Sequence, residues 1–339
     1  MAALLLSRIQ HLLLAIVLAS AVLPACAQRV PSATLVVRFS HVVSDDTPKG
    51  QMALQFKKLV EKRSQGRIRV DVYPDSQLYG DDDEMEALRL GAVELLAPSL
   101  SKFGNAGIPE MEVFDLPFLF DNLEQVRAVT QGAVGQRLLQ RLDLQQMTGL
   151  GFLDSGFKQF SAGKPLRTVG DFAGQRVRVQ SSQVLVAQMR ALGAQPVVLP
   201  FGEMRRGLAA GVVSGAENTL SNFLTQGLAR IQSDVTLTRH GYLGYAVVSN
   251  QRFWQSLSAP NAALLRQALN EALVLGNDLA AQLDSQALEQ LRRIPSVRVH
   301  ALTGAERAAL RAAVQPVYVA FRQRVGTGLL RDIEAVLAP

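Results

Sequence analysis

Residues 174–222 read GQRVRVQSSQVLVAQMRALGAQPVVLPFGEMRRGLAAGVVSGAENTLSN, and this stretch decides the fold class. A short β-branched run at Val177 and Val179 is followed by a segment of helical period and a second apolar run that ends at Phe201. Another helical segment ends near Gly211, and a third apolar run leads into residues 214–218. This β-α-β-α-β order predicts an α/β fold with a mostly parallel sheet covered by helices.

Two polar side chains stand at predicted strand ends within this stretch. Arg178 ends the first strand and Asn218 ends the third. In parallel α/β sheets, ligands bind in the crevice beyond the carboxyl ends of the strands. A guanidinium and an amide that face one crevice suit a small carboxylate, so the pattern predicts an organic acid as ligand.

The N-terminus has the features of an export signal. Arg8 gives a positive start, and residues 12–22 form an apolar core that is too short to span a membrane. Small residues at Ala25 and Ala27 predict a signal peptide over residues 1–27, with cleavage before Gln28 and a soluble periplasmic product. The same stretch also resembles a lipobox, in which case Cys26 would carry a lipid anchor.

Composition and motifs favour binding over catalysis. The 339-residue chain has a formal net charge of +6 and one cysteine, Cys26, so no disulfide is expected in the exported protein. Its histidines lack zinc-ligand spacing, and the chain has neither a phosphate loop nor a nucleophile elbow. Export argues against a nucleic-acid partner, and the scattered basic residues predict no polybasic membrane patch. We therefore expect no metal, no cofactor and no enzyme activity.

The rest of the chain continues the α/β pattern without a repeat or a low-complexity linker. The acidic run at residues 81–84 is interpreted as a helix start whose charges complement the helix dipole. Alternation and helical period predict strands at 35–40, 68–73, 93–98, 149–152 and 242–249, and helices at 52–63, 85–90, 126–142, 261–292 (with a possible break at Gly276) and 304–325.

Seven motifs in order give the chain a resemblance to a known family. It resembles the exported substrate-binding proteins of tripartite ATP-independent periplasmic (TRAP) transporters, the DctP family. The match runs from about Val36 to beyond Asn250. The motifs are FSHVVSDDTPKG (39–50), YPDSQLYGD (73–81), DLPFLF (115–120), GQRVRV (174–179), ALGAQP (191–196), GVVSGAEN (211–218) and HGYLGY (240–245).

The resemblance implies a set of ligand-binding residues. Arg178 matches the arginine that pairs with the substrate carboxylate, and Asn218 matches an asparagine that hydrogen-bonds the ligand. The other residues implied by the match are Phe201, Lys164, His41, Lys49, Ser99 and Asn222. His41, Lys49, Ser99 and Asn222 are similar to the dicarboxylate-binding branch, so the expected ligand is a C4-dicarboxylate or a close hydroxy or keto acid.

The chain also departs from the family pattern. Members usually have aspartate at Ser214 and proline at Thr219 and Gln180, and they usually have tyrosine at Arg205. Together with Arg206, Arg205 brings positive charge toward one wall of the second domain, which bears on the identity of the ligand.

The resemblance further implies the architecture and the partners. We expect a two-domain periplasmic binding protein whose discontinuous α/β domains are joined by a hinge and a long connecting helix. The predicted domains are 34–161 with 244–282, and 162–243 with 283–335. The expected partners are a small organic acid anion and the TRAP membrane permease subunits, with the receptor itself a monomer. A sensory module that reports ligand binding to a membrane signalling protein is the alternative.

Overall fold

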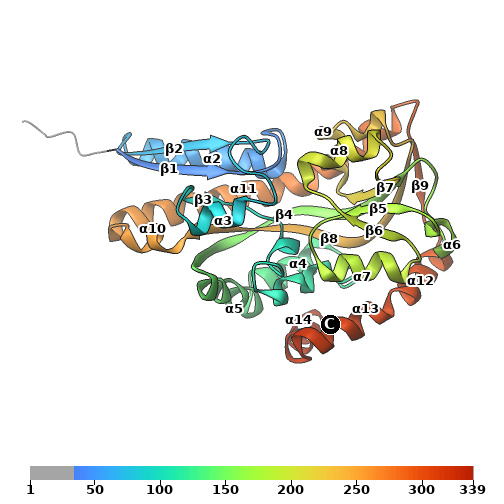
Figure 1. The fold of residues 1–339 in the computed structure, drawn as a ribbon. Helices are drawn as coiled ribbons and strands as arrows, with labels where there is room; N and C mark the ends of the chain where they lie inside the picture. Colours follow the sequence, from blue (N-terminus) through green and yellow to red (C-terminus); the bar gives the residue numbers. More distant parts are fainter. Residues whose placement is uncertain (1–33, 339) are drawn as a thin grey trace, which may run out of the picture. The chain divides into compact units, whose positions relative to one another are not determined.

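Two groups of parallel strands are joined by a long antiparallel pair. The computed structural model describes residues 34–338, and these contain a nine-stranded sheet with the order β2-β1-β3-β8-β4-β7-β5-β6, in which β9 pairs with β8 (Figure 1). The pairs β3–β8, β8–β4 and β4–β7 are antiparallel, whereas the pairs β1–β2, β1–β3, β5–β6, β5–β7 and β8–β9 are parallel. The prediction of a mostly parallel sheet is therefore right within each outer group and wrong at the centre.

The first group has the predicted bounds for two of its three strands, while the strand predicted at 93–98 is reduced to two residues. Its strands are β1 (Leu35–Ser40), β2 (Ile68–Tyr73) and the very short β3 (Leu95–Leu96). Helix α2 (Pro48–Arg63) begins four residues earlier than predicted, because the Thr47 hydroxyl accepts the Gly50 N–H and Pro48 stands in the first turn. Helix α3 (Glu84–Arg89) follows the acidic run as predicted.

The second group confirms the β-α-β-α-β order of residues 174–222. Its elements are β5 (Arg176–Val179), α7 (Gln183–Ala191), β6 (Gln195–Val198), α8 (Phe201–Ala209), β7 (Gly215–Asn218) and α9 (Leu220–Thr225). β5 lies between β6 and β7 and is parallel to both. The carboxyl ends of all three strands therefore lie at one edge.

The central pair is much longer than the sequence pattern indicates. β4 (Met147–Ala162) and β8 (Asp234–Asn250) each extend well beyond the predicted four- and eight-residue strands. Their register shifts at three places, including the step from Asp154 to Gly156, where Gly156 has a φ of 132°. These irregularities break the alternation on which the strand prediction depended.

Helix α11 (Ala259–Arg292) is continuous through Gly276, where a break was considered possible. A Cβ at Gly276 would lie 2.6 Å from Leu153 Cδ1 and 3.0 Å from Met52 Cβ. The glycine is therefore explained by close packing against β4 and α2, and it does not end the helix.

Several helices complete the two faces of the sheet. The predicted 126–142 helix is two helices, and the predicted 304–325 helix is also two, with Pro316 in the first turn of the second. A further helix, which the sequence analysis does not predict, follows Gly326. The bounds are α4 (Leu123–Thr130), α5 (Ala133–Arg141), α6 (Val169–Phe172), α10 (Gln251–Ser256), β9 (Arg298–Ala301), α12 (Gly304–Ala313), α13 (Gln315–Val325) and α14 (Gly328–Leu337). Short 3₁₀ turns cover Leu100–Lys102, Pro109–Asp115, Leu142–Gln145 and Leu228–Arg230.

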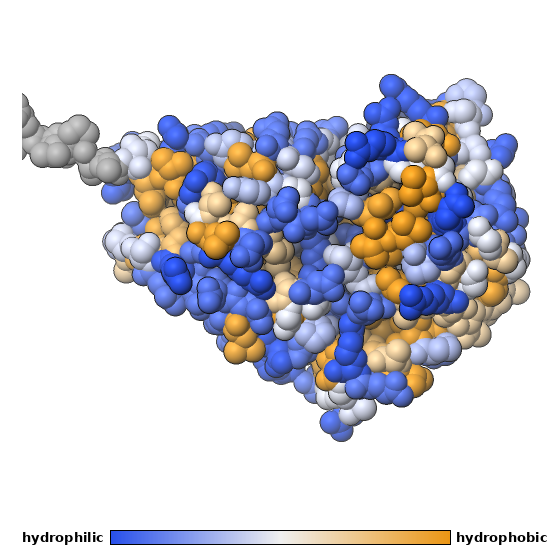
Figure 2. All heavy atoms as spheres, viewed as in Figure 1, coloured by the Kyte–Doolittle hydropathy of each residue, from blue (hydrophilic) through white to orange (hydrophobic). Residues whose placement is uncertain are grey.

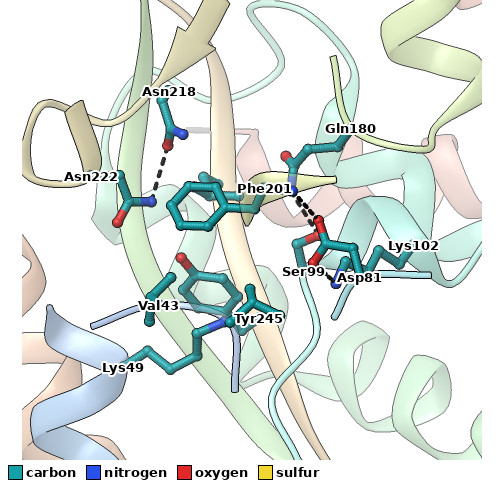
Figure 3. Close-up of a pocket in the computed structure, with 12 residues that line it drawn as sticks. Val43, Lys49, Asp81, Ser99, Lys102, Gln180, Phe201, Asn218, Asn222 and Tyr245 are labelled. Carbon is teal, nitrogen blue, oxygen red and sulfur yellow. Dashed lines mark hydrogen bonds and ion pairs between the residues drawn. The ribbon is translucent and has the colours of Figure 1, made fainter. Parts of the chain in front are cut away.

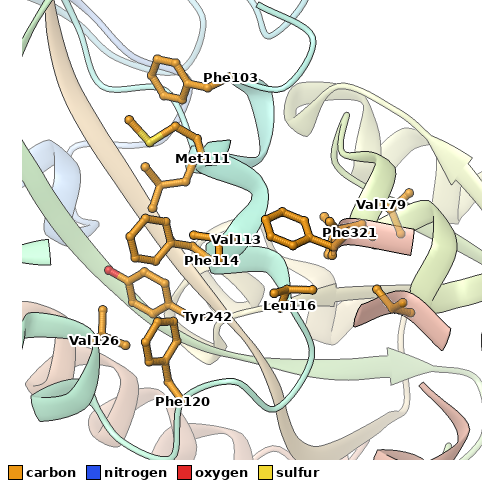
Figure 4. Packing of buried hydrophobic residues seen from close by; sticks show 14 of the residues in the cluster. Phe103, Met111, Val113, Phe114, Leu116, Phe120, Val126, Val179, Tyr242 and Phe321 are labelled. Atoms are coloured by element: carbon orange, nitrogen blue, oxygen red, sulfur yellow. The ribbon is translucent and has the colours of Figure 1, made fainter. Parts of the chain in front are cut away.

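Three hydrophobic clusters form the core. One packs α2 and α11 against β1 and β2, and another packs α8 and α9 against the end of α11. The largest contains the aromatic column of Phe114, Phe120 and Tyr242, and it reaches Val179 and Phe321 across the sheet (Figure 4). Because this cluster includes residues from both predicted domains, packing does not mark their boundary, and the domain bounds remain a prediction.

The viewed surface is mixed in character. Figure 2 shows apolar residues in separate patches among hydrophilic ones, without a continuous apolar belt. Among the described residues, no helix combines the length and apolar character needed to cross a membrane. The predicted signal peptide and its cleavage site fall outside the described residues.

Candidate ligand-binding site

A pocket lies where the carboxyl ends of the two parallel groups meet. Its empty space is about 290 Å³, including the solvent at its open mouth. Figure 3 shows side chains from both groups converging on it, with Phe201 near its centre. The pocket is lined by Val42, Val43, Lys49, Asp81, Ser99, Lys102, Gln180, Phe201, Asn218, Asn222, Leu243 and Tyr245. Five of the eight predicted site residues line it, namely Lys49, Ser99, Phe201, Asn218 and Asn222.

Lys49 enters the pocket from the first turn of α2. Its Nζ donates to the Ala97 carbonyl at 3.0 Å and lies 3.9 Å from the centre of the Tyr245 ring. The side chain is only 1% exposed. Burial, reinforced by the nearby Lys102 charge, lowers the pKa of Lys49 to about 7. Near neutral pH Lys49 is thus partly protonated, it forms no ion pair within residues 34–338, and it is held directly beside the pocket.

His41 is buried behind Lys49 and does not line the pocket. Neither of its ring nitrogens has a hydrogen-bond partner within the described residues. Burial and the Lys49 charge lower the pKa of His41 to about 3, so the ring is neutral at pH 7. His41, which the resemblance implies as a ligand-binding residue, therefore adds no second positive charge beside Lys49.

Arg178 lies near the end of β5, is 1% exposed and is not among the residues that line the pocket, although its neighbours Gln180 and Asp81 are. Its Nε donates to the Leu199 carbonyl at 2.9 Å, while one terminal nitrogen, Nη2, has no hydrogen-bond partner in residues 34–338. The nearest carboxylate oxygen, on Asp81, lies 3.9 Å from Nη2. A buried guanidinium that lacks a full set of acceptors is the chemical signature of an anion site.

The acidic run contributes to the site more than its interpretation as a helix start suggests. Lys102 pairs with both Asp81 and Glu84 in the interior. Burial opposes ionisation of Asp81, but Lys102 and then Arg178 hold its pKa below the ordinary value. Asp81 is thus an ionised carboxylate in the pocket, and Lys102 is the cation that keeps it there.

Two contacts join the parallel groups across the pocket. The N–H of Phe201, at the start of α8, donates to Asp81 Oδ2 at 2.7 Å, where the helix dipole favours a negative charge. The Gln180 side chain donates to the Ser99 hydroxyl at 2.8 Å. Both contacts connect the first strand group to the second, and all four residues that make them line the pocket.

Asn218 and Asn222 form the far wall. The Asn218 side-chain oxygen accepts from the Thr219 N–H at 2.9 Å and from Asn222 Nδ2 at 3.0 Å. These bonds leave the Asn218 amide nitrogen as the donor on the pocket side (Figure 3). The Asn222 oxygen is buried and has no partner among the described residues, so it is available as an acceptor.

A buried ionic cluster supports the strand that carries Asn218. Lys158 lies 3.0 Å from Glu217 and 3.7 Å from Asp115, and His240 lies 3.5 Å from Glu217. Burial opposes ionisation of Glu217, but Lys158 lowers its pKa below the ordinary value. Glu217 is therefore a structural acid that fixes the end of β7.

Lys164 is not brought to the pocket. It is exposed and follows the end of β4, where Ala162 pairs with Gly215 at the start of β7. The pocket lies at the other end of β7, beyond Asn218. Because β4 runs antiparallel to β7, a residue after β4 lies beside the start of β7, at the edge of the sheet opposite the pocket. We therefore drop Lys164 from the candidate site.

Arg205 and Arg206 also lie away from the pocket. Both are on the exposed face of α8, and Arg206 pairs with Glu203 one turn earlier. The concern that they would add charge to the wall of the site is therefore not supported.

Several lining residues were not predicted. Gln180 directly follows β5, so the strand-end rule that identified Arg178 would also have indicated it. Tyr245, on β8, is buried and also lines the pocket, and an aromatic residue on a strand is by itself more typical of the core. Asp81 and Lys102 are far apart in the sequence and come together only in the folded chain, so no spacing pattern indicates the pair.

Residues 34–338 contain no group of three or more potential metal-ligating side chains.

Comparison with known proteins gives a consistent result. Residues 39–324 match the bacterial extracellular solute-binding protein family 7, DctP. The C4-dicarboxylate-binding periplasmic protein DctP of Rhodobacter capsulatus is 45% identical over 304 residues, covering 90% of this chain and 91% of that protein. The protein of the same name from Shewanella loihica is 42% identical, with 87% of each chain covered.

Solved structures agree with the fold. A TRAP periplasmic solute-binding protein from Shewanella oneidensis with bound succinate has a TM-score of 0.88 at 41% identity, covering 90% of this chain and 99% of that one. One from Pseudomonas aeruginosa with bound L-malate has a TM-score of 0.82 at 39% identity, covering 84% and 99%. The chain therefore belongs to family 7 of the bacterial extracellular solute-binding proteins, the DctP family of TRAP transporter receptors, and has their two-domain α/β fold.

Proposed function

We propose that this protein captures a C4-dicarboxylate outside the cytoplasmic membrane and delivers it to TRAP permease subunits. The observation that carries this proposal is the buried Arg178 guanidinium, whose Nη2 has no hydrogen-bond partner in the described residues. A bidentate carboxylate would supply the missing acceptors. The names of the relatives and the succinate and malate in the similar structures support the same ligand class.

A dicarboxylate fits the distribution of charge around the pocket. Arg178 and Asn218 come from the second strand group, whereas Lys49 comes from the first. We place one carboxylate against Arg178 and the Asn218 amide and the other near Lys49. A monocarboxylate would leave one of these cations unpaired when water is excluded, which is unfavourable.

The role we propose is transport without catalysis. The receptor would be exported, begin at Gln28 after signal cleavage and act as a monomer that docks on the permease. The site offers charge and hydrogen bonds, while its lining residues include no nucleophile paired with a base.

A thermal-shift screen of small organic acids tests the proposal. Succinate, fumarate and malate are expected to raise the melting temperature, because a ligand that binds only the folded state stabilises it. Butyrate and other monocarboxylates of equal length should give much smaller shifts. A screen in which only sugars, amino acids or monocarboxylates stabilise the protein would overturn the proposed ligand class.

Affinity should depend on pH through Lys49. Its pKa of about 7 in the free protein means that the ammonium is lost as the pH rises through 7, and a bound carboxylate favours the charged form. Binding should therefore take up a proton, and succinate affinity should fall by about 30-fold between pH 6 and pH 8.5. Calorimetry in buffers of different ionisation enthalpy measures both effects.

The matched variant for this test is Lys49→Gln, which should bind more weakly and show a flat profile over the same range. The ionisable groups around Lys49 are Glu84, Asp81, Lys102 and His41. An unchanged pH slope in Lys49→Gln would assign the titration to another of these groups.

Ligand binding should also close the pocket. The contacts Phe201–Asp81 and Gln180–Ser99 join the two strand groups, and we propose that the domains 34–161 with 244–282 and 162–243 with 283–335 move apart when these contacts are lost. Small-angle scattering is expected to show a smaller radius of gyration with saturating succinate than without it. Identical radii would contradict a hinge motion.

A further inference from the structure

Three arginines from distant parts of the sequence surround one turn on the surface. Arg239 lies on β8, and Arg307 and Arg311 lie one helical turn apart on α12. The turn is formed by residues 118–121, between the 3₁₀ segment Pro109–Asp115 and α4. We call these three side chains the arginine cluster.

Contacts with the turn fix the position of each arginine. Arg311 donates to the Phe118 carbonyl at 3.0 Å, and Arg239 donates to the Asp121 carbonyl at 3.1 Å. The Arg307 guanidinium lies 5.7 Å from the centre of the Phe118 ring, and that of Arg239 lies 4.3 Å from the centre of the Phe157 ring. Stacking of this kind supports the guanidinium planes and leaves their edges free to bind acceptors.

The turn itself is firmly held. Phe118 has a φ of 58°, which is unusual for a bulky residue, and its N–H donates to the His240 carbonyl at 2.8 Å. The Tyr318 hydroxyl donates to the Pro117 carbonyl at 2.8 Å. The cluster is thus built on a braced surface, so its geometry is set before any partner arrives.

The charges of the cluster are not neutralised within the described part of the chain. None of the three arginines forms an ion pair there, whereas Arg298 and Arg324 each pair with a buried carboxylate. The Asp121 side chain at the same turn forms no ion pair with them either. Like charges one turn apart on a helix repel each other, so the pair on α12 gains from an external anion.

We propose that the arginine cluster docks an acidic segment of the membrane permease, whose aspartate or glutamate carboxylates bind the three guanidinium edges. This inference rests on the proposed function for the existence of the permease partner. Planar carboxylates match guanidinium geometry in a bidentate manner. Electrostatic recruitment to membranes usually takes clusters of roughly four to eight basic residues, and this cluster offers fewer.

Interferometry tests the inference by measuring how tightly the receptor binds the permease subunits of the same transporter. The permease is purified in nanodiscs of zwitterionic lipid. Arg307→Glu is the main variant, because the Arg307 side chain makes no hydrogen bond within the described residues and its exchange should not disturb folding. We expect docking of the succinate-loaded protein to weaken at least tenfold in Arg307→Glu. It should weaken further in the triple variant Arg239→Gln, Arg307→Gln, Arg311→Gln. Arg252→Glu, at another exposed arginine without an ion pair in the described chain, should dock like the wild type.

Three further measurements complete the test. Wild-type docking should weaken as NaCl rises from 50 to 300 mM, and the triple variant should respond less. Succinate binding by calorimetry should be unchanged in every variant, so loss of docking is separable from failure of the proposed ligand function. Wild-type docking that equals that of the triple variant, or that is absent, would overturn the inference. Arginine-dependent binding to vesicles of 30% phosphatidylglycerol that contain no permease would also contradict the inference. In that case the partner of the cluster would be an anionic lipid surface.

Discussion

Arg178→Ala is expected to weaken succinate binding by about 10²–10⁴-fold. Arg178 is buried, and the ligand carboxylate would be the acceptor that its Nη2 lacks in the described structure. Removing the guanidinium leaves the carboxylate in a closed site without its charged donor, and breaking a buried charge pair costs roughly 3–5 kcal/mol. Calorimetric titration measures the change directly.

Two companion variants make the result specific. Arg178→Lys keeps the charge and loses the planar fork, so it should also bind weakly. Arg176→Ala is the matched control on the same strand. Arg176 is exposed, and its guanidinium donates to the carbonyls of Gly211 and Val212 and not to the pocket. If Arg176→Ala abolished binding while Arg178→Ala did not, the carboxylate would have to be placed at the other arginine.

The parallel strands and their ends were the part of the molecule that sequence could predict. Alternation located β1 and β2 at their observed bounds, and the rule that ligands sit beyond strand ends indicated Arg178 and Asn218. The same approach predicts strands that are too short at β4 and β8. Glycines and register shifts interrupt the alternation in these two long strands.

The errors at the site have a common cause, which is that adjacency along the chain does not determine position in space. Lys164 follows a strand as Gln180 does, but β4 is antiparallel to β7, so Lys164 lies at the opposite edge from the pocket. His41 is near Lys49, but burial removes its charge. The pairing of Asp81 with Lys102 depends on the approach of two loops, which no local pattern records.

Lys102→Met should destabilise the protein by about 3–5 kcal/mol at pH 7. Lys102 is buried, and it is the cation that pairs with both Asp81 and Glu84 in the interior. Burial works against its charge, but Glu84 and Asp81 outweigh that effect and raise the pKa of Lys102. Methionine has a similar length and no charge, so the variant isolates the loss of the ion pairs from the loss of volume. Urea denaturation gives the free energy of unfolding.

The same substitution at Lys57 provides the control. Lys57 pairs with Glu61 one turn away, and both side chains are about one-third exposed (36% and 33%). An exposed pair of this kind contributes roughly 0–1 kcal/mol, so Lys57→Met should unfold at nearly the wild-type urea concentration. Equal effects in the two variants would show that the buried cluster has no special energetic weight.

The dependence on pH tests the cause of the Lys102 effect. Without Lys102, the pKa values of Asp81 and Glu84 should rise in the folded protein, because burial then opposes their charge with little compensation. Carboxyl groups with raised folded pKa values bind protons on folding, so the variant should lose stability as the pH rises from the ordinary carboxyl pKa through these raised values. The deficit relative to the wild type should thus be smaller at pH 5 than at pH 8. Since Asp81 also accepts the Phe201 N–H across the pocket, the variant should bind succinate less tightly even where it remains folded.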